Sequence, residues 1–159
     1  MEWFLVVNLM MLIGHNFFIP KTFLSLLHII QIMKKLFLDD IRYPRDAFLY
    51  MHQKIYNDLD WSIVRSFNEF IDFIEKNGIQ NIYIISFDHD LADSHYETVS
   101  QIDYDQYAEK TGYDCAKWLC DHCLNENVKL PIYYIHSMNP VGKTNIDMYL
   151  KNFQKFSNL

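Results

Sequence analysis

The sequence predicts an α/β fold, a three-layer sandwich in which a mostly parallel sheet of four to five strands lies between layers of helices. Short apolar runs, typical of strands buried on both faces, alternate with amphipathic helical patterns along residues 33–159. The clearest run, from Ile82 to Phe87, is β-branched and aromatic with little polar alternation. Three of these runs end in polar clusters, which places candidate chemistry at the carboxyl edge of the sheet.

The composition fits one folded domain with a substantial core. The chain has 159 residues, of which 50% are hydrophobic, and a formal net charge of −6. This acidic balance is poorly suited to holding long duplex nucleic acid, whereas a nucleotide or a strand terminus held through a metal ion is compatible with it. The odd number of cysteines favours a reducing, cytoplasmic compartment. Cys120 and Cys123 have CxxC spacing, but they continue an apolar helix face, so we interpret them as core residues.

Residues 1–32 differ from the rest and form a separate apolar N-terminal extension. Their only charges, on Glu2 and Lys21, cancel. The segment is interpreted either as a weak membrane segment or as sequence upstream of a natural start at Met33. We favour the second interpretation, because "MKKLFLDD" is a compact start for a cytosolic α/β domain. The predicted organisation is this extension followed by one α/β domain at 33–159, with no membrane partner expected.

The elements expected after Met33 can be ordered along the chain. Strands are predicted at residues 35–38, 61–66, 82–87 and 131–137, and helices between Ser66 and Gly78, over 112–125, and around Ile146, Tyr149, Leu150 and Phe153. Ser66 is predicted to cap its helix, with Glu69 at capping-box spacing, and Gly78 to end it. A polar, tyrosine-rich loop of about twenty residues follows the third strand and predicts a functional lid.

Ionisable and polar residues follow three of these strands. They are Asp39, Asp40 and Arg42 after the first strand, Asp88, His89 and Asp90 after the third, and His136, Ser137 and Asn139 after the fourth. Because parallel strands end at one edge, these groups are expected to meet. Clustered carboxylates repel one another unless a cation compensates, and oxygen ligands suit Mg²⁺, with Mn²⁺ as a second choice. The alternative is that the aspartates only cap helices or stabilise turns.

Two further features concern phosphate. The segment "SMNPVGKTN" after His136 contains an amide donor, a glycine that lets backbone approach a ligand and a helix start that favours an anion, so it predicts a phosphate seat beside a general acid or base. Arg42 has two interpretations that stay open. It either pairs with Asp39 or Asp90 as a buttress, or presents a planar fork to phosphate oxygens.

Three motifs, "LFLDDIRYP", "SFDHDL" and "IHSMNPVG", occur in this order and together resemble the cyclic-phosphate processing receiver domain family. The resemblance covers nearly all of 33–159 and none of 1–32. It implies a receiver-like (flavodoxin-like) fold and the processing of cyclic phosphates, such as 2′,3′-cyclic phosphate RNA ends formed in RNA damage and repair, or cyclic nucleotides. Carried over by motif, the pocket would comprise Asp39, Asp40, Asp88, His89, Asp90, His136 and Asn139. The chain departs from an ordinary signalling receiver in that His136 stands where a lysine is expected.

We therefore predict a metal-assisted hydrolase of the cyclic phosphodiesterase type, which acts on a nucleotide or an RNA terminus that carries a cyclic phosphate. The predicted metal ligands are Asp39, Asp40, Asp88 and Asp90, the predicted catalytic residues are His136, Asp88 and His89, and the predicted substrate-binding residues are Arg42, Asn139, Gly142 and Lys143. The alternative is a non-catalytic or phospho-accepting receiver module for signalling or binding, with Asp88 as the acceptor.

Overall fold

The computed structural model describes residues 33–91 and 110–157. The predictions for the N-terminal extension at 1–32 and for the lid, apart from its last residue, lie outside these residues. Within the described ranges, no helix has both the length and the apolar character needed to cross a membrane.

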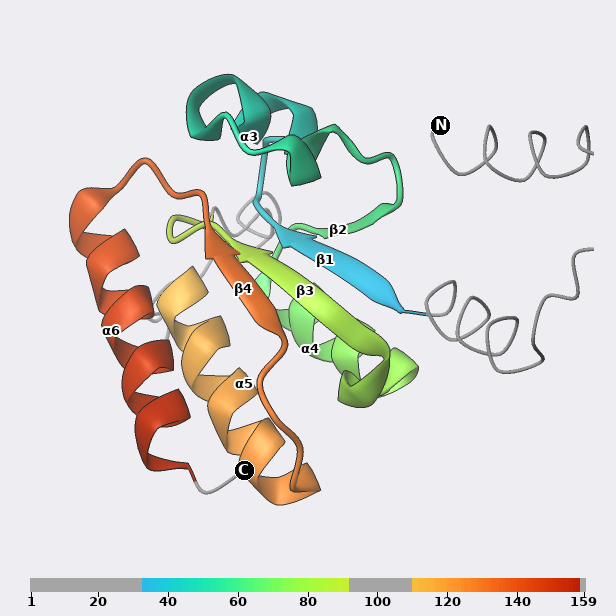
Figure 1. Cartoon of the computed structure of the whole chain (residues 1–159), viewed down its shortest axis with the longest axis vertical. Helices are drawn as coiled ribbons and strands as arrows, with labels where there is room; N and C mark the ends of the chain where they lie inside the picture. Colours follow the sequence, from blue (N-terminus) through green and yellow to red (C-terminus); the bar gives the residue numbers. More distant parts are fainter. Residues whose placement is uncertain (1–32, 92–109, 158–159) are drawn as a thin grey trace, which may run out of the picture. The chain divides into compact units, whose positions relative to one another are not determined.

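Four parallel strands form one sheet, in the order β2-β1-β3-β4 (Figure 1). They are β1 (Lys34–Leu38), β2 (Trp61–Val64), β3 (Ile82–Phe87) and β4 (Ile132–Ile135). The last residues of all four strands share one row, since Leu38 pairs with Val64 and with Phe87, and Phe87 pairs with Ile135. The predicted parallel sheet is confirmed, with four strands in the described part of the chain.

Two strands end two residues earlier than the sequence predicts. β2 stops at Val64 because the next backbone N–H, that of Arg65, bonds to Glu69 Oε2 (2.7 Å) and Ser66 becomes a helix cap. β4 stops at Ile135, and the side chain of the following residue, His136, turns into a buried polar network. Both strands give way to side-chain hydrogen bonds, which hydrophobic periodicity does not reveal.

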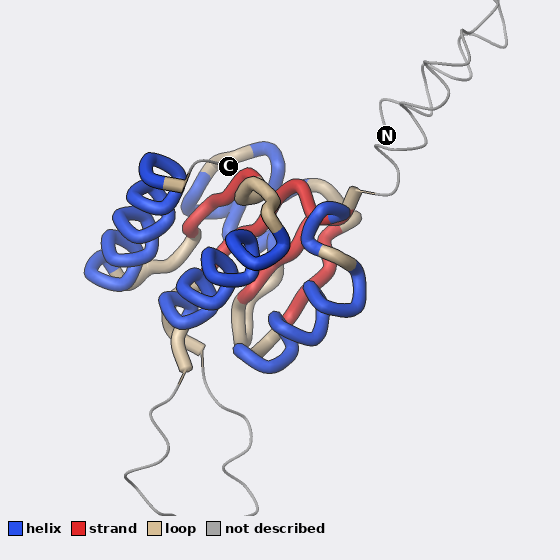
Figure 2. Tube along the Cα trace, turned by 90° about the horizontal axis from the view of Figure 1, so that it is seen from below, coloured by secondary structure: helices blue, strands red, loops and turns tan. Residues whose placement is uncertain are grey.

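Helices lie on both faces of the sheet (Figures 1 and 2). They are α3 (Pro44–Met51), α4 (Phe67–Asn77), α5 (Gly112–Glu126) and α6 (Pro140–Phe156), with short 3₁₀ turns η1 (Lys54–Asn57) and η2 (Ile79–Asn81). α4, α5 and α6 pack with Leu36, Leu38, Ile85 and Phe87 on one face. α3 and η1 pack with Phe37, Ile84 and Trp61 on the other face. The two clusters make the three-layer receiver-like sandwich that the sequence predicts.

The predicted helix between Ser66 and Gly78 is confirmed. Ser66 Oγ accepts a hydrogen bond from the Glu69 N–H (3.2 Å), and Gly78 ends α4 with a positive φ of 78°. α5 and α6 also occur where the sequence predicts helices. In contrast, α3 and η1 were not predicted, because α3 has only eight residues and begins at Pro44, which reads as part of a turn.

The chain changes the direction in which it adds strands to the sheet, at the centre of the sheet between β1 and β3. From β1 the chain passes over one face through α3 to β2, and it then returns over the opposite face through α4 to β3, on the other side of β1. The carboxyl ends of β1 and β3 therefore flank the crevice where open α/β sheets bind ligands. Asp39 and Asp88 follow these two strand ends directly.

Candidate functional site at the carboxyl ends of the strands

The three strand ends place Asp39, Asp88 and His136 side by side. The hydrogen-bond ladder continues for one residue beyond the strands, since Asp88 N–H donates to Leu38 O (2.8 Å) and His136 N–H donates to Phe87 O (2.9 Å). Strand alternation directs these side chains away from the face that carries Leu38 and Phe87 and toward the layer of α3. The predicted meeting of these three strand ends is therefore observed.

Asp39 is fully buried and accepts hydrogen bonds with both carboxylate oxygens. Oδ1 accepts from the backbone N–H groups of Ile41 (2.9 Å) and Arg42. Oδ2 accepts from His136 Nε2 (3.1 Å) and forms an ion pair with Arg42 Nε (2.8 Å). Burial alone would raise the pKa of Asp39, but these donors and the positive charge of Arg42 lower it to about 2. Asp39 is therefore ionised at neutral pH.

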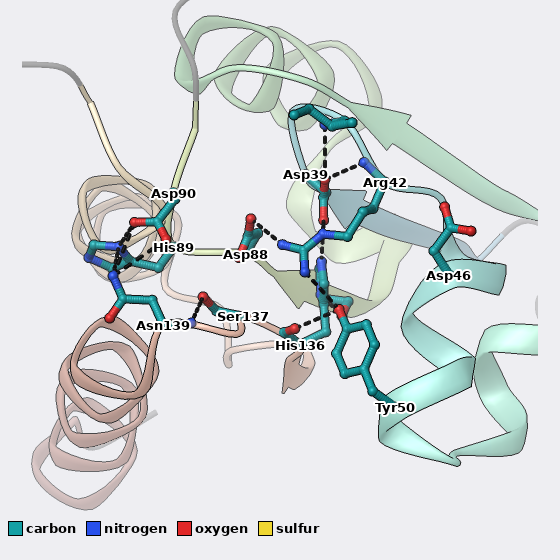
Figure 3. A network of polar contacts seen from close by, with 12 residues as sticks. Asp39, Arg42, Asp46, Tyr50, Asp88, His89, Asp90, His136, Ser137 and Asn139 are labelled. Carbon is teal, nitrogen blue, oxygen red and sulfur yellow. Dashed lines mark hydrogen bonds and ion pairs between the residues drawn. The ribbon is translucent and has the colours of Figure 1, made fainter.

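Arg42 connects the ends of β1 and β3 (Figure 3). Its Nε contacts Asp39 Oδ2 and its Nη2 lies 2.6 Å from Asp88 Oδ2, while Nη1 donates to the hydroxyl of Tyr50 (3.1 Å). Burial disfavours the charged guanidinium, but the charges of Asp88 and Asp39 outweigh it and raise the pKa of Arg42. The ion pairing of the buttress interpretation is observed, while phosphate binding by Arg42 stays a prediction. The partners are Asp39 and Asp88, and Asp90 is not one of them.

Asp88 has a carboxylate oxygen that is available to a ligand. It is only 2% exposed, its Oδ2 is paired with Arg42, and its Oδ1 has no hydrogen-bond partner among the residues that the structure describes. Asp39, Asp40 and Asp88 each offer one oxygen, and these oxygens lie within 4.8 Å of one another. An all-oxygen donor set with an unsatisfied buried oxygen fits Mg²⁺ or Mn²⁺. Asp90 lies outside this group.

His136 is fully buried and stacks on the ring of Phe37, with ring centroids 4.2 Å apart. Its Nε2 faces Asp39 Oδ2, and its Nδ1 lies 2.7 Å from Ser86 Oγ. Burial lowers the pKa of His136 despite the nearby carboxylates, so the ring is neutral at pH 7. Because an ionised carboxylate only accepts, Nε2 carries the proton and Nδ1 accepts from Ser86, whose Oγ then accepts from the Tyr56 hydroxyl (2.8 Å).

Four residues of this network were not predicted from the sequence. Ser86 and Tyr56 extend the chain of hydrogen bonds behind His136, and Tyr50 donates to the backbone oxygen of His136 (2.8 Å). Arg65 Nη1 donates to the backbone oxygens of Asp39 (2.8 Å) and Arg42 (2.6 Å) and so holds the loop after β1. Tyr50 lies in a helix that the sequence did not reveal, and none of the four carries a motif of its own.

A second polar cluster lies beside the first and contains His89, Asp90 and Asn139 (Figure 3). His89 Nδ1 is 2.7 Å from Asp90 Oδ1, and the Asn139 amide donates to the same oxygen (3.1 Å). Hydrogen bonds from His89 and Asn139 outweigh partial burial and lower the pKa of Asp90. The Asp90 carboxylate therefore holds His89 and Asn139 together and is not part of the carboxylate group at Asp39, Asp40 and Asp88.

At the start of α6, where the sequence predicts a phosphate seat, two of the chain's own side chains lie against Gly142. Asn139 Oδ1 accepts from the Gly142 N–H (3.0 Å), which satisfies one of the free donors at the helix start. A Cβ on Gly142 would lie 2.1 Å from Cγ of His89, so the glycine makes room for that imidazole. Lys143 follows in the first turn and is half-buried. Phosphate binding by Asn139, Gly142 and Lys143 stays a prediction.

The cysteines play no part in either cluster. Cys115, Cys120 and Cys123 are buried in α5, and burial raises the pKa of Cys120 to about 12 and that of Cys123 to about 11. The interpretation of Cys120 and Cys123 as core residues is confirmed, because both are buried in the larger hydrophobic cluster.

Comparison with known proteins identifies the fold that carries these clusters. The family model of the cyclic-phosphate processing receiver domain matches residues 34–152. The chain belongs to this family. Its matched segment includes both polar clusters and all four strands of the described sheet. Neither the curated proteins nor the solved structures searched gave a match.

Proposed function

We propose that this receiver domain hydrolyses cyclic phosphodiesters, such as 2′,3′-cyclic phosphate RNA ends or cyclic nucleotides, with a divalent cation held by Asp39, Asp40 and Asp88. One observation carries the proposal. Asp88 Oδ1 is buried at the switch point of the sheet and has no hydrogen-bond partner within the described ranges, beside two further carboxylates. A buried carboxylate oxygen is costly without a partner, and a cation would supply one. Family membership supports the substrate class.

The reaction requires that a water oxygen bonds to phosphorus, that the bond from phosphorus to one ring oxygen breaks, and that this oxygen takes up a proton. A bound divalent cation would polarise a phosphoryl oxygen and lower the pKa of a coordinated water. The part of Asp39, Asp40 and Asp88 is to hold that cation at the strand ends. The remaining requirement, proton transfer, falls to a histidine.

Two predicted catalytic histidines differ in access. His136 is fully buried and both of its ring nitrogens have partners, so it would pass a proton only through Asp39 or Ser86. The side chain of His89 is 18% exposed, Asp90 orients its Nδ1, and no described residue bonds to its Nε2. We therefore assign contact with the substrate to His89 and the orientation of Asp39 to His136.

The test is turnover of a panel of substrates by the full chain. The panel comprises 2′,3′- and 3′,5′-cyclic nucleotides and RNA with a 2′,3′-cyclic end, each with and without Mg²⁺ or Mn²⁺. Metal-dependent turnover is expected for at least one of them, and Asp88→Asn is expected to lower both Mg²⁺ affinity and turnover, the latter by ~10²-fold or more. Asp72→Asn, which removes the same charge from the exposed face of α4, serves as the matched control.

Two results would contradict the proposal. One is the absence of turnover of every cyclic phosphate in the presence of metal. The other is an Asp88→Asn protein whose Mg²⁺ affinity, measured by calorimetry, equals that of the unaltered chain. Either result would direct attention to the alternative, in which the domain signals or binds without hydrolysis.

The same oxygen of Asp88 favours one alternative, a receiver that accepts a phosphoryl group. A carboxylate oxygen without a partner at the end of β3 is a potential nucleophile toward a phosphodonor. Incubation with a small phosphodonor followed by intact mass measurement separates the two functions. Only the alternative predicts a base-labile adduct that is lost in Asp88→Asn.

A further inference from the structure

Arg42 lies between two of the carboxylates that are proposed to hold a cation. Its guanidinium contacts Asp39 Oδ2 through Nε (2.8 Å) and Asp88 Oδ2 through Nη2 (2.6 Å). With Asp40 nearby, the site has three carboxylates and one guanidinium. The arginine thus offsets part of the repulsion that these carboxylates would otherwise experience.

This arrangement limits how a metal ion can bind. Asp39 already accepts three hydrogen bonds, and its Oδ2 also forms an ion pair with Arg42 Nε, so four contacts occupy its two oxygens. Asp88 has only Oδ1 without a partner in the described residues. Asp39 Oδ1 is held by two backbone N–H groups of the loop, so the side-chain partner that an ion can replace most readily is the guanidinium at Asp39 Oδ2. An ion that takes Oδ1 of Asp88 and Oδ2 of Asp39 therefore competes with Arg42 Nε for the second oxygen.

The side chain of Arg42 can leave without moving the loop that bears it. The Arg42 backbone N–H bonds to Asp39 Oδ1, and its backbone oxygen accepts from Arg65 Nη1 (2.6 Å). Neither bond involves the guanidinium. The side chain is 25% exposed, whereas those of Asp39 and Asp88 are 0% and 3% exposed, so the guanidinium borders solvent above the two carboxylates.

We propose that Arg42 alternates between two partners: it bridges Asp39 and Asp88 in the metal-free protein, and it binds the phosphate of the ligand once a divalent cation has taken the carboxylates. A displaced guanidinium is a fork of donors that matches phosphate oxygens. Phosphate lowers the cost of displacing Arg42, and the cation frees Arg42 for phosphate, so each ligand strengthens the binding of the other. This inference rests on the proposed function and adds the coupling between its two ligands.

The experiment measures Mg²⁺ affinity of the full chain by calorimetry, without and with saturating inorganic phosphate. Arg42→Gln removes the bridging charge, Arg42→Lys keeps a charge without the planar fork, and Arg45→Gln, an exposed position in α3, controls for net charge. Circular dichroism establishes that each variant is folded. The direct attraction between Mg²⁺ and phosphate is common to all variants and cancels in the comparison.

The expected result has two parts. Without phosphate, Arg42→Gln binds Mg²⁺ about tenfold more tightly than the unaltered chain, because no guanidinium has to be displaced. With phosphate, the gain in Mg²⁺ affinity is several-fold smaller in Arg42→Gln than in the unaltered chain. Arg45→Gln behaves as the unaltered chain in both conditions. If Arg42→Gln does not fold, Arg42→Lys provides the test. In that variant the gain in Mg²⁺ affinity caused by phosphate should be smaller than in the unaltered chain.

Two outcomes would overturn the inference and are distinguishable. If the unaltered chain binds Mg²⁺ but the folded arginine variant binds it equally or more weakly, or shows the same phosphate effect, Arg42 is a fixed buttress while the proposed function stands. If no variant binds Mg²⁺ at all, both the inference and the metal-assisted function fail.

Discussion

Asp39 and His136 form a buried pair whose protonation is set by their surroundings. Several donors and Arg42 lower the pKa of Asp39 to about 2, and burial lowers the pKa of His136. Unfolding would return both groups to ordinary values of about 3.9 and 6.5. In each case the unfolded chain binds more protons than the folded chain as the pH falls. Both groups therefore make stability rise with pH, Asp39 in strong acid and His136 below neutrality.

His136→Asn should reveal the part of this effect that belongs to the histidine. In the metal-free protein, the variant should be less stable than the unaltered chain at pH 7, by about 1–3 kcal/mol, because it loses the ring that stacks on Phe37. Between about pH 6.5 and pH 5, the stability of the variant should fall less than that of the unaltered chain. In the unaltered chain, His136 is neutral when folded and takes up a proton on unfolding, and the variant lacks this proton uptake. Urea unfolding at several pH values measures both.

His52→Asn is the matched control for that comparison. His52 is exposed at the end of α3 in the left-handed conformation, with φ of 53°, which asparagine tolerates well. The control should leave the pH dependence unchanged. Equal slopes for His136→Asn and the unaltered chain would show that the buried histidine does not contribute to acid sensitivity.

At the scale of elements, apolar runs and caps predicted most of the fold. β3 is buried on both faces and only Ser86 interrupts its apolar sequence, while β1 ends in the apolar run Leu36–Leu38. α4 carries a serine cap and a terminal glycine, each of which acts within a few residues of itself. α3 has neither signal, because its N-cap is Tyr43 and its C-cap is His52, and its buried residues are only Pro44 and Ala47.

The site was predictable only in part, for a related reason. Topology alone brings Asp39, Asp88 and His136 together, so parallel strands were enough to predict their meeting. The bridge by Arg42 depends on side-chain geometry that no spacing encodes, and so does the chain from Tyr56 through Ser86. The hydrogen bonds from Arg42 to Asp88, from Tyr56 to Ser86 and between Ser86 and His136 span 30 to 50 positions of sequence.

Two helix starts abut the site, and substituting their glycines should have different effects. A Cβ on Gly112 would lie 1.7 Å from the backbone oxygen of Asp88, whereas a Cβ on Gly142 meets the side chain of His89. Gly112→Ala should destabilise the protein by about 1–3 kcal/mol, despite the higher helix propensity of alanine, because backbone must move. Gly112→Ala should also weaken Mg²⁺ binding, since the backbone that must move belongs to Asp88, a proposed metal ligand.

Gly142→Ala provides the comparison within the same experiment. It should disturb the cluster of His89, Asp90 and Asn139 and lower turnover while leaving Mg²⁺ affinity near that of the unaltered chain. Urea unfolding and Mg²⁺ titration of both variants measure these effects. A Gly112→Ala protein with unaltered stability would mean that α5 does not fix the end of β3.

At the scale of the whole domain, the functional groups lie between β1 and β3, where the chain changes from crossing one face of the sheet to crossing the other. Each face of the sheet has its own cluster of buried side chains, and the residues of both clusters lie between Leu36 and Leu150. The site residues extend from these clusters at one end of the sheet. Integrity of the site therefore depends on a core that the described domain supplies itself.

A chain that begins at Met33 should consequently fold on its own. Both faces of the described sheet are covered by its own helices, so a single cooperative urea transition is expected, with a midpoint and a Mg²⁺ affinity close to those of the full chain. A chain that begins at Leu36 after an initiator methionine is the matched comparison. It should be less stable, because it lacks Lys35, whose buried ammonium contacts Asp58 and Asp60. Aggregation of the Met33 chain beside a stable full chain would show that the domain requires residues 1–32.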